Sequence, residues 1–231
     1  MKSGASPELS ASWWVKNKAK SLIGADLEKP LAAYEKPFSE FKKSPEETSN
    51  LTKALDALKK LPAAVKKTIE KCNSKLHKET IECLKKFDPL IKSQQRNIEV
   101  ELERRKQVDK MTVSDWVNGP LKAKFLAFAT KSQNEDIVSY LVLMKGKKGD
   151  RKIFDLYIAT GSKYELNIDG PLRAKFCKSG DKTMKIPLDD LDSAPWDQVY
   201  PIVEGMAINN LKGPFQTELK GKDYTFADLL K

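Results

Sequence analysis

The sequence predicts a protein that is mostly helical and built in two parts. Through much of residues 1–110, apolar residues recur every three or four positions, which is the spacing of a helix with one buried face. The composition then changes. Residues 1–110 carry 24 Lys/Arg against 16 Asp/Glu, residues 111–231 carry 18 against 16, and 9 of the 11 glycines follow position 115. We therefore place a domain boundary near residues 109–112, between a basic helical bundle (1–110) and a second domain (111–220) with a tail (221–231).

Three helix signals open the first part. A helix is predicted over 13–23 and ended by Gly24, and a second over 26–43 with a kink at Pro37. Residues 44–47, Ser-Pro-Glu-Glu, supply a cap, a proline for the first turn and two acidic residues that favour a helix start.

After Pro62 the sequence predicts the longest helix of the chain, bent or divided at Pro89. A single helix cannot bury a long apolar stripe by itself, so we expect the preceding helices to fold back on it as a bundle. The stripe consists of Val65, Ile69, Cys72, Leu76, Thr80, Leu84, Phe87, Ile91, Ile98 and Leu102.

Composition limits the function classes. No apolar run approaches the roughly 18 residues of a transmembrane helix, and no apolar core of a signal peptide follows Met1, so a cytoplasmic protein is expected. The 3 cysteines form no CxxC pair, and His77 is the 1 histidine. Neither a metal site, a cofactor cradle nor a catalytic triad is predicted, which favours a binding protein over an enzyme.

The basic first part leaves a second kind of partner open. Trp13 and Trp14, followed by three lysines, fit a helix at an anionic membrane surface, and the net charge of the chain, +10, also fits nucleic acid. The tryptophans could instead dock into the bundle, which weighs against the membrane. The glutamates interspersed among the lysines weigh against nucleic acid. Membrane association is thus an alternative to a purely cytoplasmic location. The membrane candidates are Trp13, Trp14, Lys16, Lys18 and Lys20.

The local residue pattern does not decide whether the second part is helical or contains strands. Residues 138–143 and 153–158 are rich in β-forming side chains and are bounded by glycines, so they could be strands. The same residues also fit helical spacing, and short apolar runs cannot be assigned by period alone.

Residues 153–169, Ile-Phe-Asp-Leu-Tyr-Ile-Ala-Thr-Gly-Ser-Lys-Tyr-Glu-Leu-Asn-Ile-Asp, resemble the middle of an RGS domain, the regulator of G-protein signalling module. That family has an Ile-aromatic-x-x-aromatic-aliphatic helix, a short loop often containing Gly-Ser, and a hydrophobic-Asn-hydrophobic-Asp entry to the next helix. Arg173 matches a basic residue that typically follows. Weaker likenesses flank this block: Phe-Leu-Ala-Phe at 125–128 with the acidic loop after it, and Trp-Asp-Gln-Val-Tyr at 196–200.

The resemblance implies an all-α protein, in which an N-terminal helical bundle with a long helix is followed by an RGS-like multi-helix bundle over 111–220. Asn167 and Asp169 would then cap the helix that begins at Pro171. It also implies a protein partner, a G-protein α subunit or another signalling protein. RGS domains hold the partner's switch loops in place and donate no catalytic group of their own.

The chain departs from the family at the positions that contact the partner. Ile137 stands where the family has an asparagine, and a second family asparagine falls near Pro187. The last contact loop, around Met206, lacks the family's Asp and Arg. We therefore predict a regulatory protein without GTPase-activating activity, with true GTPase activation as an alternative. The candidate partner-binding residues are Gln133, Asn134, Glu135, Asp136, Ile137, Met184, Pro187, Met206, Asn209 and Asn210.

Overall fold

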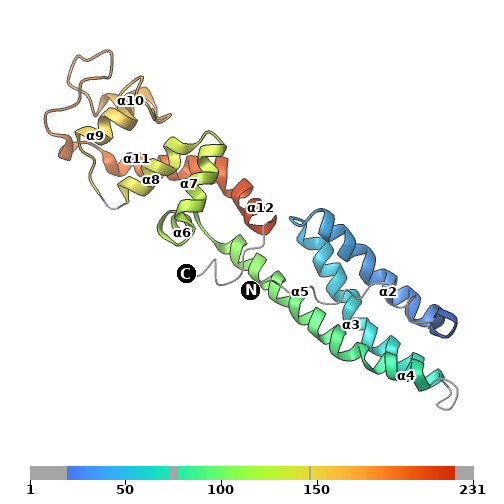
Figure 1. Cartoon of the computed structure of the whole chain (residues 1–231). Helices are drawn as coiled ribbons and strands as arrows, with labels where there is room; N and C mark the ends of the chain where they lie inside the picture. Colours follow the sequence, from blue (N-terminus) through green and yellow to red (C-terminus); the bar gives the residue numbers. More distant parts are fainter. Residues whose placement is uncertain (1–19, 73–77, 146, 222–231) are drawn as a thin grey trace. The chain divides into compact units, whose positions relative to one another are not determined.

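The computed structural model describes residues 20–72, 78–145 and 147–221, and most of them are helical (Figure 1). For residues 20–26 and Cys83 only the backbone is described. These ranges contain no strand, and one isolated bridge pairs Cys177 with Pro187. The predicted all-α class is confirmed, and the two stretches for which strands remained open, 138–143 and 153–158, are helical.

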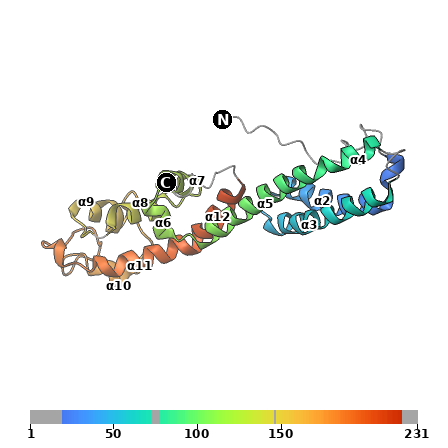
Figure 2. The ribbon, with the colours of Figure 1, turned by 90° about the horizontal axis from the view of Figure 1, so that it is seen from below.

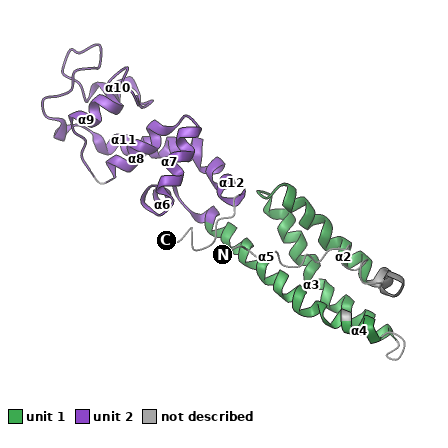
Figure 3. Cartoon of the chain, in the orientation of Figure 1, with its two compact units in different colours: residues 1–107 green, residues 108–231 purple. Residues whose placement is uncertain are grey.

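The described chain divides into two compact units, 1–107 and 108–231, coloured separately in Figure 3. The division lies a few residues before the boundary expected from composition and falls inside a helix. Unit 1 contains α2 (Lys20–Lys43), α3 (Thr48–Lys71), α4 (Lys78–Lys85) and most of α5 (Phe87–Lys110).

Within unit 1, α2, α3 and α5 lie side by side (Figures 1 and 2). Each contributes one face to an aliphatic core, because their buried residues recur at helical spacing. Leu27 and Leu31 come from α2, Leu58 from α3, and Ile91 and Ile98 from α5.

Helix α3 passes through Pro62, although the sequence predicted a helix end there. Proline has no N–H, so the carbonyl of Leu58, four residues earlier, loses its helical donor. Gln95 of α5 replaces that donor: its Nε2 lies 3.2 Å from the Leu58 carbonyl oxygen. The predicted long helix after Pro62, bent or divided at Pro89, is therefore wrong in its bounds: its apolar stripe is divided among α3, α4 and α5, and Pro89 lies in the first turn of α5.

Helix α2 corrects a second expectation. It begins at Lys20 and continues through Gly24, Pro30 and Pro37, so the predicted stop at Gly24 and new start at 26 are wrong. Its buried residues, among them Leu27 and Tyr34, pack continuously into the core. Tertiary packing of an amphipathic face contributes more to a helix than the local propensity of one glycine.

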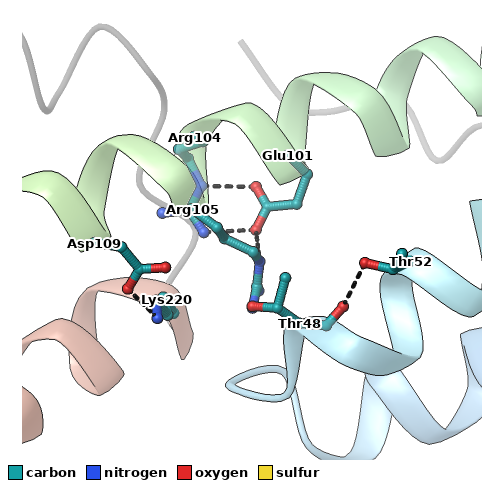
Figure 4. A network of polar contacts seen from close by, with 7 residues as sticks. All are labelled: Thr48, Thr52, Glu101, Arg104, Arg105, Asp109 and Lys220. Carbon is teal, nitrogen blue, oxygen red and sulfur yellow. Dashed lines mark hydrogen bonds and ion pairs between the residues drawn. The ribbon is translucent and has the colours of Figure 1, made fainter.

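A buried charge cluster lies where α5 meets the start of α3 (Figure 4). Glu101 accepts from Arg104 at 2.6 Å and from Arg105 at 2.7 Å, and both arginines are 4 % exposed or less. Arg105 also lies over the Phe41 ring, 4.9 Å from its centroid. Burial raises the pKa of Glu101, but the hydrogen bonds and charges of the two arginines outweigh burial and bring the pKa below its usual value.

Unit 2 is built from shorter helices around an aromatic core. Trp116, Phe125 and Phe215 pack with ring centroids 4.9–5.2 Å apart, and Phe128 adds to them. Its elements are α6 (Val113–Asn118), α7 (Lys122–Lys131), α8 (Glu135–Met144), α9 (Arg151–Ile153), the π-helix η1 (Phe154–Ile158), α10 (Gly170–Ala174), the 3-10 helix η2 (Leu191–Ser193), α11 (Trp196–Ala207), the π-helix η3 (Ile208–Lys212) and α12 (Gly213–Gly221).

Side-chain caps begin several of these short helices. Thr112 and Asp115 form a reciprocal capping box on α6, and the side chains of Asp150, Asp169 and Asp190 accept from backbone N–H groups at the starts of α9, α10 and η2. Such caps matter most in short helices, because a large share of their N–H groups lies in the first turn.

Candidate partner-binding surface

The connection between α7 and α8 is a tight turn in an unusual backbone conformation. Gln133 has a φ of 56°, in the left-handed region that side chains other than glycine rarely adopt. Asn134 follows it, and the Asn134 amide donates to the Ser132 carbonyl at 2.6 Å. The turn leaves the Gln133 side chain exposed and Asn134 partly exposed.

The π-helix η3 brings a second pair of amides to this turn. A π-helix contains more residues per turn than an α-helix, which changes the direction of the side chains that follow it. Asn209 and Asn210 are both exposed in η3. The Asn210 Nδ2 lies 3.5 Å from the Asn134 Oδ1, at the outer limit of hydrogen-bond distance. Two segments 76 residues apart in sequence thus meet at this point.

Residues 159–165 form a loop beside the α7–α8 turn. The Tyr164 hydroxyl lies 3.4 Å from the Glu135 carboxylate, and the Lys163 ammonium lies 4.6 Å from the centroid of the Tyr164 ring. Tyr164 also stacks on Tyr157 of η1, with centroids 5.7 Å apart. Burial raises the pKa of Tyr157, so this inner tyrosine remains protonated at neutral pH.

Arg173 fixes the shape of that loop from inside the protein. Its guanidinium donates to the carbonyls of Ile158 at 2.7 Å and Leu166 at 2.8 Å, the two residues that flank the loop. It also pairs with Glu165 at 2.7 Å, and Glu165 accepts from the Gly161 N–H at 2.7 Å. Arg173 is 6 % exposed, so one buried cation holds both ends of the loop.

Residues 181–186 form the next loop, and Asp181 organises it. The Asp181 carboxylate accepts from the backbone N–H groups of Thr183, Lys185 and Ile186 and from the Thr183 hydroxyl, at 2.6–2.9 Å. The hydroxyl of Thr183 is the main reason why the pKa of Asp181 falls to about 2, and the backbone donors lower it further.

Met184, at the centre of this loop, has a φ of 53°. Its carbonyl accepts from the Thr160 N–H at 3.1 Å, which joins the loop to residues 159–165. Gln133 and Met184 are the non-glycine residues with positive φ among the described residues, and both lie in this connected set of loops. Non-glycine residues in such conformations concentrate at functional sites, where the surrounding structure holds them.

We call the connected segments 132–136, 160–165, 181–186 and 208–210 the loop surface. The structure brings most of the candidate partner-binding residues to it. Gln133, Asn209 and Asn210 are exposed there, and Asn134, Glu135, Asp136 and Met184 are partly exposed. Met206 is partly exposed on α11 and packs against the core.

Two candidates do not lie on the surface. Ile137 is 5 % exposed and packs in the core of unit 2 with Val138 and Leu141. Pro187 is also buried, beside Cys177 in the isolated bridge. Neither side chain can be a major contact for a partner, so both are removed from the candidate set.

The two predicted caps have different outcomes. The Asp169 side chain accepts from the Leu172 N–H at 2.6 Å and is the N-cap of α10, with Pro171 in the first turn. Asn167 lies two residues before that cap and its side chain is exposed. Of the two, Asp169 alone caps α10, because Asn167 precedes the first turn by too many residues.

The membrane candidates near the N-terminus cannot be placed. Trp13, Trp14, Lys16 and Lys18 lie outside the described residues, as does His77, and of Lys20 only the backbone is described, at the start of α2. In the described ranges, no helix has both the length and the hydropathy needed to span a bilayer.

Sequence reasoning did not identify Tyr164 or Asp181 as part of the surface. A signal for Asp181 was present, because Asp-x-Thr favours a turn in which the carboxylate accepts from backbone N–H groups two residues on. Tyr164 gave no comparable signal, since its contact with Glu135 joins residues 29 apart.

The loop surface combines four side-chain amides with four carboxylates and three lysines. Within the part of the chain that the structure describes, no cluster of three or more His, Cys, Asp or Glu side chains could hold a metal ion. The amide, hydroxyl, carboxylate and ammonium groups of the loop surface donate or accept hydrogen bonds.

Comparisons with known proteins identify no relative. No protein-family model, no curated protein and no solved structure matches the chain.

Proposed function

We propose that unit 2 is an RGS-like docking domain and that the chain regulates or recruits another protein without catalysing a reaction itself. The observation that carries this proposal is the contact between Asn134 and Asn210. It joins the α7–α8 turn to η3, beside Gln133 with its left-handed backbone. Segments remote in sequence converge there on exposed polar side chains.

The chemistry of the surface supports a protein as the partner. Side-chain amides both donate and accept, so Gln133, Asn209 and Asn210 can pair with the backbone of an exposed loop in another protein. The burial of Arg173 and the turn of Asp181 pre-shape the neighbouring loops, which lowers the entropy lost on binding.

The buried position of Ile137 argues against GTPase activation. The resemblance places at this position an asparagine that supports the partner's switch, and a buried isoleucine supplies no polar contact. We therefore propose docking to a signalling protein, with a G-protein α subunit as the first class to test and no acceleration of its GTP hydrolysis.

The test uses the full chain and a panel of purified G-protein α subunits in GDP-bound, GTP-analogue and transition-state-analogue forms. Binding is measured by biolayer interferometry, and hydrolysis by single-turnover GTP cleavage. At least one α subunit is expected to bind, and its hydrolysis rate is expected to stay unchanged. The double variant Gln133→Ala/Asn209→Ala should weaken binding by more than about tenfold, since central contacts dominate an interface.

A control is available on the two helices that precede these positions, α7 and α11. Lys122 and Gln198 are exposed at the starts of α7 and α11, whereas the loop surface lies beyond the ends of these helices. Lys122→Ala/Gln198→Ala should leave binding unchanged. No binding by any α subunit would reject this partner class, equal losses in both variants would reject the surface, and accelerated hydrolysis would establish the activator alternative.

A further inference from the structure

Helix α3 of unit 1 has an outward face composed largely of lysine. Its core-facing residues, such as Leu51, Leu58 and Leu61, are buried. Along the rest of the helix, 6 lysines are exposed and the acidic residues are Asp56 and Glu70. The lysines are Lys53, Lys59, Lys60, Lys66, Lys67 and Lys71.

The spacing of these lysines gathers them on one side. Lys53, Lys60 and Lys67 are seven residues apart, as are Lys59 and Lys66, and seven residues are nearly two turns of an α-helix. At 100° per residue the whole set covers an arc of about 140°, and at 1.5 Å per residue it extends for about 27 Å along the helix axis. We call this set the lysine face.

Helix α5, in the same unit, shows that the lysine face is not a general property of unit 1. Its exposed charges are balanced, and they pair along the helix: Lys92 with Asp88 at 2.6 Å and Lys106 with Glu103 at 3.7 Å. On α3, a pair between Lys66 and Glu70 is at the 4.0 Å limit of an ion pair. The 6 lysines of α3 outnumber its 2 acidic residues, so a net positive charge is concentrated on this helix.

We propose that the lysine face binds an anionic lipid surface and thereby holds the chain against a membrane. The face has no large exposed apolar residue, and Val100 on α5 is the one large apolar side chain exposed in the described part of unit 1. Attachment is thus electrostatic, with the lysines above lipid headgroups and the helix outside the acyl region.

Two observations favour lipid over nucleic acid. The exposed side of α3 presents no arginine, asparagine, glutamine or aromatic residue, so it has no group that reads base edges or stacks on bases. Asp56 and Glu70 lie within the arc of lysines and would oppose phosphates fixed along a duplex. Lipids diffuse laterally, so anionic headgroups can collect beneath the lysines and leave the two carboxylates over neutral ones.

The test measures sedimentation of the full chain with phosphatidylcholine vesicles, with and without about 30 % phosphatidylserine. Binding is expected to require phosphatidylserine and to weaken as salt is raised from 50 to 300 mM, roughly as screening predicts. The variant Lys53→Gln/Lys59→Gln/Lys60→Gln should lower the apparent association constant by more than about tenfold, because each lysine at such a surface strengthens binding about fivefold.

The control variant Lys92→Gln/Arg96→Gln/Lys106→Gln removes the same charge from exposed positions of α5 and should change binding less than about threefold. Circular dichroism checks that both variants remain helical, since glutamine and lysine have similar helix propensities. Equal losses in the two variants, or no binding to phosphatidylserine vesicles, would overturn the proposal. Tighter binding to a DNA duplex than to vesicles, with the same dependence on α3, would overturn it in favour of nucleic acid.

Discussion

The two units use opposite means to reach a helical fold. In unit 1, α2, α3 and α5 are each 24 residues long, and their aliphatic stripes form the core. In unit 2, α11, η3 and α12 follow one another without a break, but the other described helices have at most 10 residues, and aromatic side chains form much of the core.

This difference shows which interactions stabilise helices that are too short to be stable by themselves. Isolated helices shorter than about 12 residues are unstable in water, so those of unit 2 need other interactions to fix their ends and the loops between them. Caps from Asp150 and Asp169, the buried Arg173 and the turn of Asp181 supply these interactions. Unit 1 relies mainly on packing, together with the Glu101 charge cluster and the bond from Gln95 that replaces a missing backbone donor to Leu58.

The largest expected effect is at Arg173. Replacing it with methionine, Arg173→Met, leaves the carbonyls of Ile158 and Leu166 without their donors and Glu165 without its cation. We expect the free energy of unfolding of unit 2 to fall by about 3 kcal/mol, the cost of breaking a buried pair of this kind. Hydrogen exchange of the α7 and α8 amides measures the loss in unit 2 separately from unit 1.

The control is Arg151→Met, because Arg151 pairs with Asp155 at 2.9 Å but is 66 % exposed. Its loss should cost less than about 1 kcal/mol. Similar values for the two substitutions would mean that the buried position of Arg173 contributes nothing beyond an exposed ion pair.

The second effect is in unit 1, at Gln95. Gln95→Leu removes the donor to the Leu58 carbonyl and should lower the free energy of unfolding of unit 1 by about 1–2 kcal/mol, as for a buried acceptor left unsatisfied. Exchange of the α3 amides provides the measurement.

A double-mutant cycle with Pro62→Ala makes this test specific. Alanine restores an N–H that can bond to the Leu58 carbonyl, so Gln95→Leu should cost less than half as much in that background. Equal costs in both backgrounds would show that Gln95 stabilises the unit by packing alone.

The third effect is at the start of unit 2. Thr112→Ala removes the side-chain acceptor for the Asp115 N–H and should cost about 1 kcal/mol of unit 2 stability. The Thr112 N–H and, next, the Thr112 hydroxyl hold the pKa of Asp115 below its usual value, so this pKa should rise when the hydroxyl is removed. Thr130→Ala is the control, because Thr130 lies near the end of α7 and its hydroxyl bonds back to Leu126; it should cost nothing measurable.

The smallest expected effect on global stability comes from the titration of Asp181, which acts mainly on its own loop. Its pKa is lowered to about 2 in the folded protein, so its contribution is fully present above the ordinary value of 3.8 and is lost as pH falls through about 2. Carboxyl NMR should show this low pKa, and amide shifts of residues 183–186 should change with it. Asp181→Asn, with one acceptor oxygen in place of two, should shift the same amides at neutral pH; unchanged amides would show that the carboxylate does not hold the loop.

Some of this architecture could be predicted from the sequence and some could not. Helical spacing marked α3 and α5 because their apolar residues repeat over 24 residues. The same spacing did not locate the helix ends, since Gly24 and Pro62 are tolerated once tertiary contacts replace what they remove. Short helices such as α9 and η1 give too few periods to be distinguished from strands, and the resemblance to RGS domains was needed to expect helices there.

The loop surface shows a similar limit. The resemblance to RGS domains identified the turn at Gln133 and Asn134 and the segment at Asn209 and Asn210, and the structure brings Asn134 and Asn210 together. It did not show that Ile137 would be buried. On α8, residues 137, 140, 141 and 144 form the buried side, and burial depends on which side of a short helix meets the core.

The bond between Gln95 and Leu58 also has a consequence for the order in which unit 1 folds. Helices α2 and α3 are neighbours in sequence and can pair with little loss of chain entropy, but the Leu58 carbonyl has no protein donor until α5 arrives, 37 residues later. If α5 docks after the rate-limiting step, Gln95→Leu will accelerate unfolding and leave the folding rate unchanged. Because of Pro62, the Leu58 carbonyl would then gain its hydrogen-bond donor only in the last step of assembly, when α5 docks.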